Sequence, residues 1–306
     1  MEKKVSYHPE TIIRAGKIKI AQDSFGNPDA PPLILVAGLG FQMIMYDEVF
    51  CRTLASRGFW VIRFDNRDTG RSERINVRLK NVARLIRDAV DGKKVDVPYT
   101  LFDMADDVAG LMDALKIKSA HIAGCSMGGR ICQIMGIRHQ KRIRTITSIM
   151  STTGDPKLPP PTPEAMTVLY RTLPDRREGY IDTFVRNWED LGGVGEASDK
   201  EINYVRKMAE KSFDRGYDPA GVARQMAAIA AAGNIRPLLD SVKSPTLVIH
   251  GEADPLLPKE CGVDTANAIP GAELLIIKAM GHTLPEHLWP RIIDAICEHV
   301  EPYKFA

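Results

Sequence analysis

The sequence predicts an α/β protein with a mostly parallel central sheet, flanking helices and an inserted helical lid. Two observations carry this prediction. Short apolar runs, typical of strands covered on both faces, alternate with amphipathic helical stretches in the first half of the chain and again near its end. Between these parts, from residue 151 to about 235, only helical patterns follow one another. Alternating strands and helices produce parallel strands joined by right-handed crossovers.

Six apolar runs are expected to be strands. They are residues 33–37, 59–64, 120–124, 143–150, 246–250 and 274–277. Between the second and third runs, apolar residues of segment 103–115 recur at i, i+4, i+7, i+8 and i+11, which is one face of a helix. Near the end, apolar residues repeat every four positions over 288–300, and Pro285 marks a plausible helix entry.

We expect residues 1–150 and 236–306 to form the core and residues 151–235 to form the lid. The insertion opens with a proline-rich run, 155–163, which cannot be the interior of a strand or helix. Four helical stretches then follow with no strand pattern between them, at 164–172, 177–191, 198–213 and 219–232. The lid is therefore expected to be helical throughout.

Composition excludes several classes of function. The 306 residues are 44% hydrophobic and 26% charged, as in ordinary globular proteins. A net charge of +2 gives no electrostatic argument for a nucleic-acid or membrane partner. No apolar run reaches the roughly 18 residues that span a bilayer, and no secretory signal is recognised. The five scattered cysteines lack a C-x-x-C pair, which favours reduced thiols and a cytoplasmic protein. A homodimer is compatible with the sequence.

The strongest local signal is Gly124-Cys-Ser-Met-Gly128, which matches G-x-S-x-G. An apolar strand ends at Gly124 and a helical stretch begins at Gly128, so Ser126 lies on a sharp strand-to-helix turn. Such a turn forces the serine outward, and the following helix directs its free N–H groups at any oxyanion formed there. We expect Ser126 to be a nucleophile, and the alternative is a glycine-rich corner with an incidental serine.

A serine nucleophile needs a base, and the base needs an orienting acid. His282 is the expected base because it follows the strand that ends at Ile277, at the sheet edge where ligands bind. Asp254 is the expected acid because it follows the strand at 246–250, and Glu252 is its rival. The order Ser126, Asp254, His282 matches the Ser…Asp/Glu…His order of one fold. Four other histidines are expected at the surface (His8, His139, His287 and His299), and two are expected to be structural (His121 and His250).

The oxyanion donors are expected to be the backbone N–H groups of Met127 and Leu39, with Gly38 and Gly40 allowing close approach of the backbone. Gly38 and Gly40 are also expected to border a substrate pocket, to which Met43, together with Met45 and Met127, is expected to add apolar walls. Phe184 and Trp188 repeat with Tyr180 at helical spacing. They are expected to pack the lid on the core, with substrate contact as the alternative.

Five motifs together carry a family resemblance. They are Val36-Ala-Gly-Leu-Gly40, residues 61–72 (VIRFDNRDTGRS), residues 124–129 (GCSMGG), residues 250–258 (HGEADPLLP) and Met280-Gly-His282. The chain resembles the α/β-hydrolases of the serine esterase and methylesterase branch, and residues 63–72 are especially similar to aclacinomycin-type methylesterases. Most relatives carry His where Ala37 stands, and a larger or more polar residue where Cys125 stands. We expect Cys125 to be a buried filler.

The resemblance implies a carboxylic-ester hydrolase that acts on small to medium esters through a Ser-His-Asp triad and an acyl-enzyme. Carbon–carbon bond hydrolysis, lactone hydrolysis and acyl transfer use the same triad and stay open, as does a non-enzymatic small-molecule receptor. No cofactor and no catalytic metal are expected, because no H-E-x-x-H exists and Met43 replaces the third glycine of a dinucleotide fingerprint.

Two further segments are interpreted as structural. Asp65, Arg67 and Asp68 are expected to fix a loop near the site through ion pairs. The basic run from residue 71 to residue 94 also contains acidic residues, and it is most simply a solvated surface.

Overall fold

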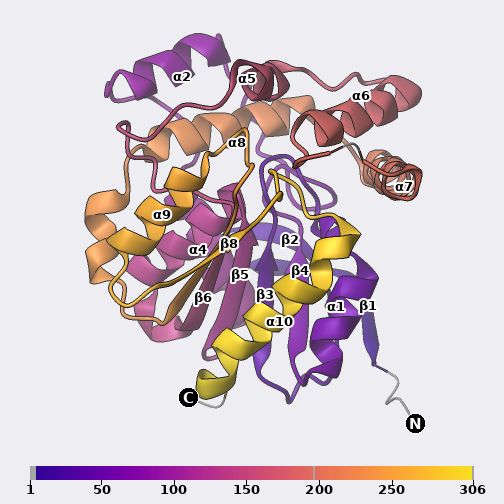
Figure 1. Cartoon of the computed structure of the whole chain (residues 1–306), viewed down its shortest axis with the longest axis vertical. Helices are drawn as coiled ribbons and strands as arrows, with labels where there is room; N and C mark the ends of the chain where they lie inside the picture. The colour runs from indigo at the N-terminus through magenta and orange to yellow at the C-terminus, as the bar shows by residue number, and fades with distance from the viewer. Residues whose placement is uncertain (1–4, 196, 305–306) are drawn as a thin grey trace.

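The computed structural model describes residues 5–195 and 197–304. Its eight strands form one sheet in the order β1-β2-β4-β3-β5-β6-β7-β8 (Figure 1). β3 to β8 run parallel, whereas β1 and β2 pair antiparallel at one edge. The strands are β1 (Tyr7–Ala15), β2 (Ile18–Phe25), β3 (Pro32–Val36), β4 (Trp60–Phe64), β5 (Ala120–Cys125), β6 (Ile143–Ile149), β7 (Thr246–Gly251) and β8 (Glu273–Ile277). The mostly parallel central sheet is thus confirmed.

Helices cover both faces of this sheet, as predicted. The helices are α1 (Glu48–Ser56), α2 (Val82–Val90), α3 (Leu101–Ala114), α4 (Met127–Arg138), α5 (Pro163–Tyr170), α6 (Arg177–Asp190), α7 (Asp199–Arg215), α8 (Pro219–Ala232), α9 (Lys259–Ala268) and α10 (Trp289–Val300). Among the described residues, no helix combines the length and apolar character that a membrane span requires.

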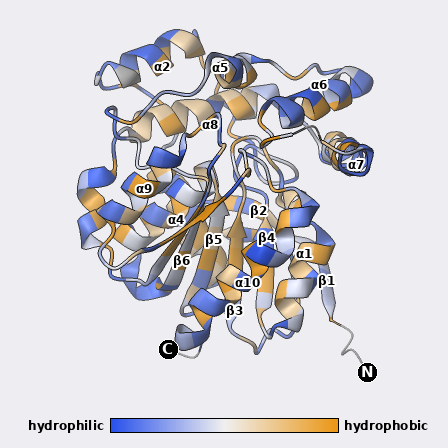
Figure 2. Ribbon diagram, in the orientation of Figure 1, coloured by the Kyte–Doolittle hydropathy of each residue, from blue (hydrophilic) through white to orange (hydrophobic). Residues whose placement is uncertain are grey.

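The parallel strands form where the apolar runs lie, because each run buries both of its faces. In β3, Ile34 and Val36 pack with α3 and α4, while Leu33 and Leu35 pack with α1 and α10 on the other face. Figure 2 shows hydrophobic residues gathered on the strands, whereas hydrophilic residues predominate on the outward surfaces of α7 and α9. The core therefore consists of two apolar layers separated by the sheet.

The antiparallel strands β1 and β2 were not anticipated from the sequence. β1 exposes most of its residues, so it carries no clear apolar period. β2 buries polar residues, among them Asp23, whose Oδ1 accepts from Arg63 Nε on β4 at 2.7 Å. Because its partner lies 40 residues away, burial of this carboxylate could not be predicted from local hydropathy.

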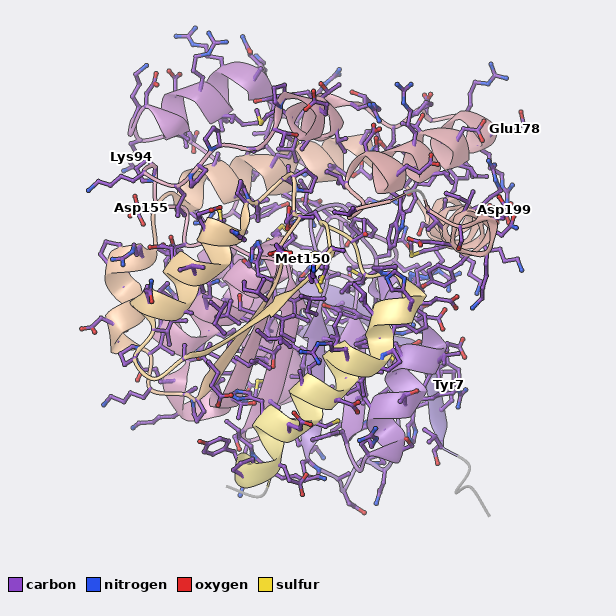
Figure 3. The ribbon with its side chains drawn as sticks, in the orientation of Figure 1. Tyr7, Lys94, Met150, Asp155, Glu178 and Asp199 are labelled. Carbon is purple, nitrogen blue, oxygen red and sulfur yellow. The ribbon has the colours of Figure 1, made fainter. Side chains whose placement is uncertain are left out.

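Residues 151–235 contribute α5, α6, α7 and α8, which lie together above the end of the sheet (Figure 1). α2 joins this group and packs on α8. Figure 3 shows Met150, directly after β6, near the middle of the molecule below these helices, while Glu178 and Asp199 lie at outer ends of α6 and α7. We use "lid helices" for α2 and α5 to α8.

The prediction of a solvated surface for the basic segment 71–94 is confirmed for its basic residues and wrong for one side of α2. Lys80, Arg84 and Lys93 are exposed, as a solvated surface requires. The other side of α2 is not solvated surface, because Val82 and Ile86 line an internal cavity. The apolar side of α2 was missed in the sequence because many charged residues surround its few apolar ones.

Buried ion pairs fasten the lid helices to the loop after β4. Asp68, which is 1% exposed, accepts from Arg224 of α8 at 2.7 and 2.9 Å. Asp65 accepts from Arg215 of α7 at 2.9 Å, and Arg67 pairs instead with Asp107 of α3 at 2.6 Å. Separating such a pair would leave a buried charge without a partner, which strongly destabilises the folded protein. These pairs therefore fix the positions of α7 and α8.

Replacing Arg224 with methionine should lower the free energy of unfolding by about 3–5 kcal/mol, because Asp68 would stay buried without its cation. Urea denaturation followed by circular dichroism measures this change. Arg206→Met is the matched control, since Arg206 pairs with Asp182 at the exposed surface of the lid helices. Equal losses in the two variants would show that the buried pair does not hold α8.

Candidate active site

Ser126 lies at a sharp corner between β5, which ends at Cys125, and α4, which begins at Met127. Its φ of 55° and ψ of −117° are unusual for a residue with a side chain. The corner needs glycine at position 128, because a Cβ there would lie 2.1 Å from the Val36 carbonyl oxygen. Strand and helix therefore approach closely, and the half-buried Ser126 side chain points out of the turn.

The structure brings Ser126, His282 and Asp254 together. Ser126 Oγ lies 3.0 Å from His282 Nε2, and His282 Nδ1 lies 2.7 Å from Asp254 Oδ2. Asp254 is buried, and its Oδ1 accepts from the N–H groups of Leu256 and Leu257. Because a carboxylate only accepts, Nδ1 carries the imidazole proton and Nε2 is free to accept from the serine hydroxyl. The rival acid Glu252 is exposed and takes no part in this chain of hydrogen bonds.

Backbone N–H groups surround the serine. Met127 is the first residue of α4, where the N–H groups of the first turn have no partner within the helix. On the loop after β3, the Gly40 N–H donates to Gln225 Oε1 of α8 at 2.9 Å. Within the described residues no hydrogen bond engages the preceding Leu39 N–H. Gly38 lies beside the serine, since a Cβ on it would be 3.6 Å from Ser126 Cβ.

Comparison with known proteins agrees with the fold described above. The sequence profile described as "alpha/beta hydrolase fold" matches residues 31–193, which contain β3 to β6 and the Ser126 corner. The chain belongs to the α/β hydrolase fold family. The hydrolase fold and the resemblance inferred from the motifs are thus confirmed.

Three relatives of this α/β hydrolase illustrate the range of the family. Rhodomycin D methylesterase DnrP of Streptomyces peucetius is 26% identical over 95% of this chain and 98% of its own. The 2-hydroxymuconate semialdehyde hydrolase of Pseudomonas sp. (strain CF600) is 28% identical over 64% of this chain and 67% of its own. The crystal structure of an enol-lactonase from Burkholderia xenovorans LB400 superposes with a TM-score of 0.70 at 25% identity, covering 96% of this chain and 99% of that one.

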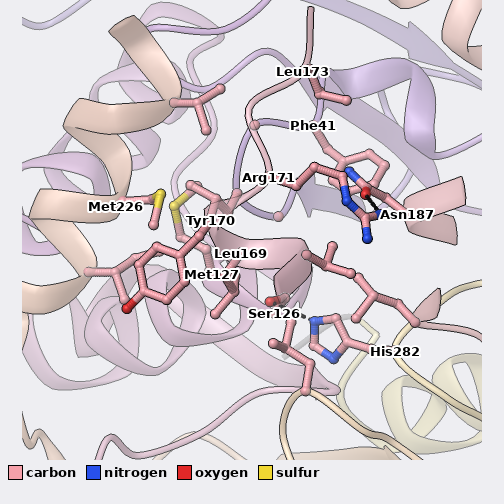
Figure 4. A pocket seen from close by; sticks show the side chains of 18 of the residues that line it. Phe41, Ser126, Met127, Leu169, Tyr170, Arg171, Leu173, Asn187, Met226 and His282 are labelled. Carbon is pink, nitrogen blue, oxygen red and sulfur yellow. Dashed lines mark hydrogen bonds between the residues drawn. The ribbon is translucent and has the colours of Figure 1, made fainter. Parts of the chain in front are cut away.

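A cavity of about 620 Å³ lies between the sheet edge of this α/β hydrolase and its lid helices. Ser126, Met127 and His282 line it from the core, and Leu169, Tyr170 and Met226 line it from the lid helices (Figure 4). Most of its walls are apolar side chains. Arg171 projects into it, and its Nη1 donates to Asn187 Oδ1 at 2.6 Å (Figure 4). The same Nη1 donates to Asp190 Oδ2 at 2.7 Å.

Predicted pocket residues divide into two groups. Gly38, Gly40, Phe184 and Trp188 line the cavity. Phe184 also stacks edge-on against Phe41 of the core loop at 5.5 Å between ring centroids, so it packs lid on core and faces the cavity at once. Met43 was wrongly predicted here. It is 1% exposed behind the wall, and its N–H donates to Asp65 Oδ1. Met45 and Met127, which were predicted with it, do line the cavity.

The remaining histidines do not reach Ser126. His121 is buried with Nδ1 at 2.9 Å from Thr145 Oγ1, and burial lowers its pKa to about 4. His250 Nε2 bonds the Leu257 carbonyl at 2.8 Å and lies 3.6 Å from Asp254 Oδ2. His299 was expected at the surface, which is wrong. It is 6% exposed because α10 turns it toward Pro245 at the start of β7.

Cys125 lies next to Ser126 and belongs to the same cavity wall, but its thiol is bonded within the core. The Tyr46 hydroxyl donates to its Sγ at 3.2 Å, and the side chain is buried. Burial raises the pKa of this thiol to about 12. A protonated thiol is a poor nucleophile, so Cys125 is a packing residue beside the serine.

The loop that carries His282 is held by two backbone hydrogen bonds that no sequence pattern predicted. The His282 N–H donates to the Leu191 carbonyl at 2.7 Å, and the Val194 N–H donates to the Ala279 carbonyl at 3.0 Å. Both bonds join this loop to the connection between α6 and α7. Gly193 is required there, because a Cβ would lie 1.8 Å from the Ala279 oxygen. The position of the imidazole therefore depends on the lid helices.

Gly193→Ala should push the two loops apart and displace His282 from Ser126. We expect a fluorophosphonate probe to label Ser126 about 10- to 100-fold more slowly, since displacements near 1 Å at a reacting centre cost about this much. Val194→Ala is the control, because it keeps the backbone bond and its side chain is 77% exposed. Unchanged labelling of Gly193→Ala would mean that the loop contact does not position the imidazole.

Proposed function

We propose that this α/β hydrolase is a serine carboxylic-ester hydrolase with Ser126, His282 and Asp254 as its catalytic triad. The observation that carries the proposal is the continuous chain of hydrogen bonds from Ser126 Oγ through the imidazole to Asp254. A serine hydroxyl becomes nucleophilic when an oriented imidazole takes its proton. The serine also stands at the floor of an apolar cavity, where an ester would be held away from bulk water.

The reaction follows from the positions of these groups. Ser126 Oγ attacks the ester carbonyl while its proton passes to His282 Nε2. Asp254 holds Nδ1 and stabilises the resulting imidazolium. The imidazolium then protonates the departing alcohol, which leaves an acyl group on Ser126. Water, deprotonated by the same nitrogen, attacks that acyl group and releases the acid, which restores the serine.

The negative charge on the tetrahedral intermediate requires donors on the opposite side of the acyl carbon. We assign this role to the N–H groups of Met127 and Leu39. The bond from the Gly40 N–H to Gln225 favours Leu39, because it engages the neighbouring N–H of the loop. The N-terminal end of α4 adds its partial positive charge at the same point.

The apolar walls favour a substrate whose acyl or alcohol part is largely apolar, and the methylesterase relative supports a methyl ester. An enol-lactonase with the same fold makes lactone hydrolysis the second candidate, since a lactone is a cyclic ester opened by the same steps. All five cysteines are free thiols, which supports a reducing, cytoplasmic location.

Hydrolysis of p-nitrophenyl acetate and butyrate and of a set of methyl esters, lactones and thioesters tests the function. Wild type should turn over many times, and Ser126→Ala should lose a factor on the order of 10⁶ in kcat because the nucleophile is absent. Ser241→Ala is the control, since Ser241 is exposed and its hydroxyl bonds only the Leu238 carbonyl of its own turn. Absence of turnover with every substrate, or an active Ser126→Ala, would overturn the proposal. A single slow turnover with retained binding would instead indicate a receptor.

Gln225→Leu should free the Gly40 N–H and let the oxyanion loop shift. We expect kcat to fall about tenfold with little change in KM, which is less than the roughly 10²- to 10³-fold cost of losing a donor outright. Gln225→Glu keeps an acceptor for the Gly40 N–H and should retain more of kcat. If both variants show the same fall in kcat and the same rise in KM, the residue serves only the packing of α8.

A further inference from the structure

Arg130 has an unusual environment among the buried arginines. It lies on α4, four residues after Ser126, is 4% exposed and lines the cavity. The other three arginines that are buried in the described residues each face a carboxylate within 3 Å. These pairs are Arg63 with Asp23, Arg67 with Asp107 and Arg224 with Asp68. No carboxylate of the described residues lies within ion-pair distance of Arg130.

The hydrogen bonds of Arg130 use only part of its guanidinium. Nη1 donates to the Ile229 carbonyl at 3.4 Å, and Nη2 donates to the Gly233 carbonyl, both at the C-terminal end of α8. Buried Nε has no partner among the described residues. A guanidinium carries five N–H groups in one plane, so three remain after these two bonds. Neutral carbonyls at a helix end offset some of the charge, but they do not neutralise it.

Burying a cation without a carboxylate lowers the stability of the folded protein, yet this protein has one at position 130. Desolvation lowers the pKa of Arg130 to about 10, so the group remains protonated at neutral pH. Arg171, the other arginine that lines the cavity, differs because Asp190 already neutralises it. Replacing a buried charge with an apolar side chain often costs nothing, so its presence in an apolar cavity points to a use.

We propose that Arg130 binds a carboxylate of the substrate, so that the ester hydrolysed at Ser126 carries a second, anionic group. This inference rests on the proposed ester hydrolysis. The free N–H groups of one guanidinium match the two oxygens of a carboxylate, and its single charge matches a monoanion. The anion would be held on the α4 side of the cavity, where Thr152 and Ile229 also line it. The apolar walls would contact the chain between the carboxylate and the ester.

The test uses matched pairs of methyl esters. Each monomethyl ester of glutaric, adipic, pimelic and suberic acid is compared with the same ester bearing an uncharged terminal amide. Wild type should favour the carboxylate member of at least one pair by about tenfold or more in kcat/KM, as a charge-assisted bidentate contact allows. Arg130→Met should abolish this ratio, and Arg130→Lys should keep part of it.

The ratio separates binding from structure, because damage to α4 or α8 would slow both members of a pair equally. Arg138→Met is the control, since Arg138 lies on the same helix and pairs with exposed Asp106. Equal rates for the two members in wild type, or a ratio unchanged in Arg130→Met, would overturn the inference and leave the esterase proposal standing.

A binding measurement covers the case in which none of these esters is hydrolysed. Calorimetry with Ser126→Ala should give a Kd for the preferred half-ester at least about tenfold below that of its amide, and Ser126→Ala with Arg130→Met should not distinguish them. Tighter binding of the half-ester without any hydrolysis would contradict the esterase proposal and leave the role of Arg130 standing. No preference in either assay would sink the role of Arg130.

Discussion

The hydrogen bond between Ser126 Oγ and His282 Nε2 joins residues 156 positions apart, so it depends on the arrangement of the whole sheet. β5, β7 and β8 run parallel, so the segments that follow them emerge at one edge. Ser126, Asp254 and His282 each lie just past one of these strands. The strands are fixed by two apolar layers, which makes the meeting of the three side chains a consequence of core packing.

The lid helices cover the cavity and also hold loops that surround Ser126. The connection between α6 and α7 accepts the His282 N–H through Leu191 and closes on the Ala279 carbonyl through Val194 and Gly193. Gln225 of α8 holds the Gly40 N–H of the loop beside the serine. Two of the loops around Ser126 are therefore fixed by residues of the insertion. Movement of the lid helices would therefore displace both the imidazole of His282 and the loop beside the serine.

Buried charge is distributed unevenly in this molecule. Asp65 and Asp68, after β4, neutralise arginines of α7 and α8, so the lid helices are held by pairs that are costly to break. Arg171 faces the cavity already neutralised by Asp190. Arg130 faces it with no carboxylate of the described residues beside it, and this contrast within one protein sets the α4 side of the cavity apart from its other walls.

Sequence by itself determined the features that depend on local pattern. The apolar runs located β3 to β8, the spacing of glycines around Ser126 located the corner, and strand ends pointed to Asp254 and His282. Only the tertiary structure decided that Met43 lies behind the cavity wall, that α2 joins the lid helices, that β1 and β2 extend the sheet and that His299 is buried. The tertiary structure alone showed that Arg130 has no counter-ion among residues 5–195 and 197–304. Hydropathy along a chain reports which residues avoid water, whereas the partner of a buried charge or polar strand is brought to it by folding from distant positions.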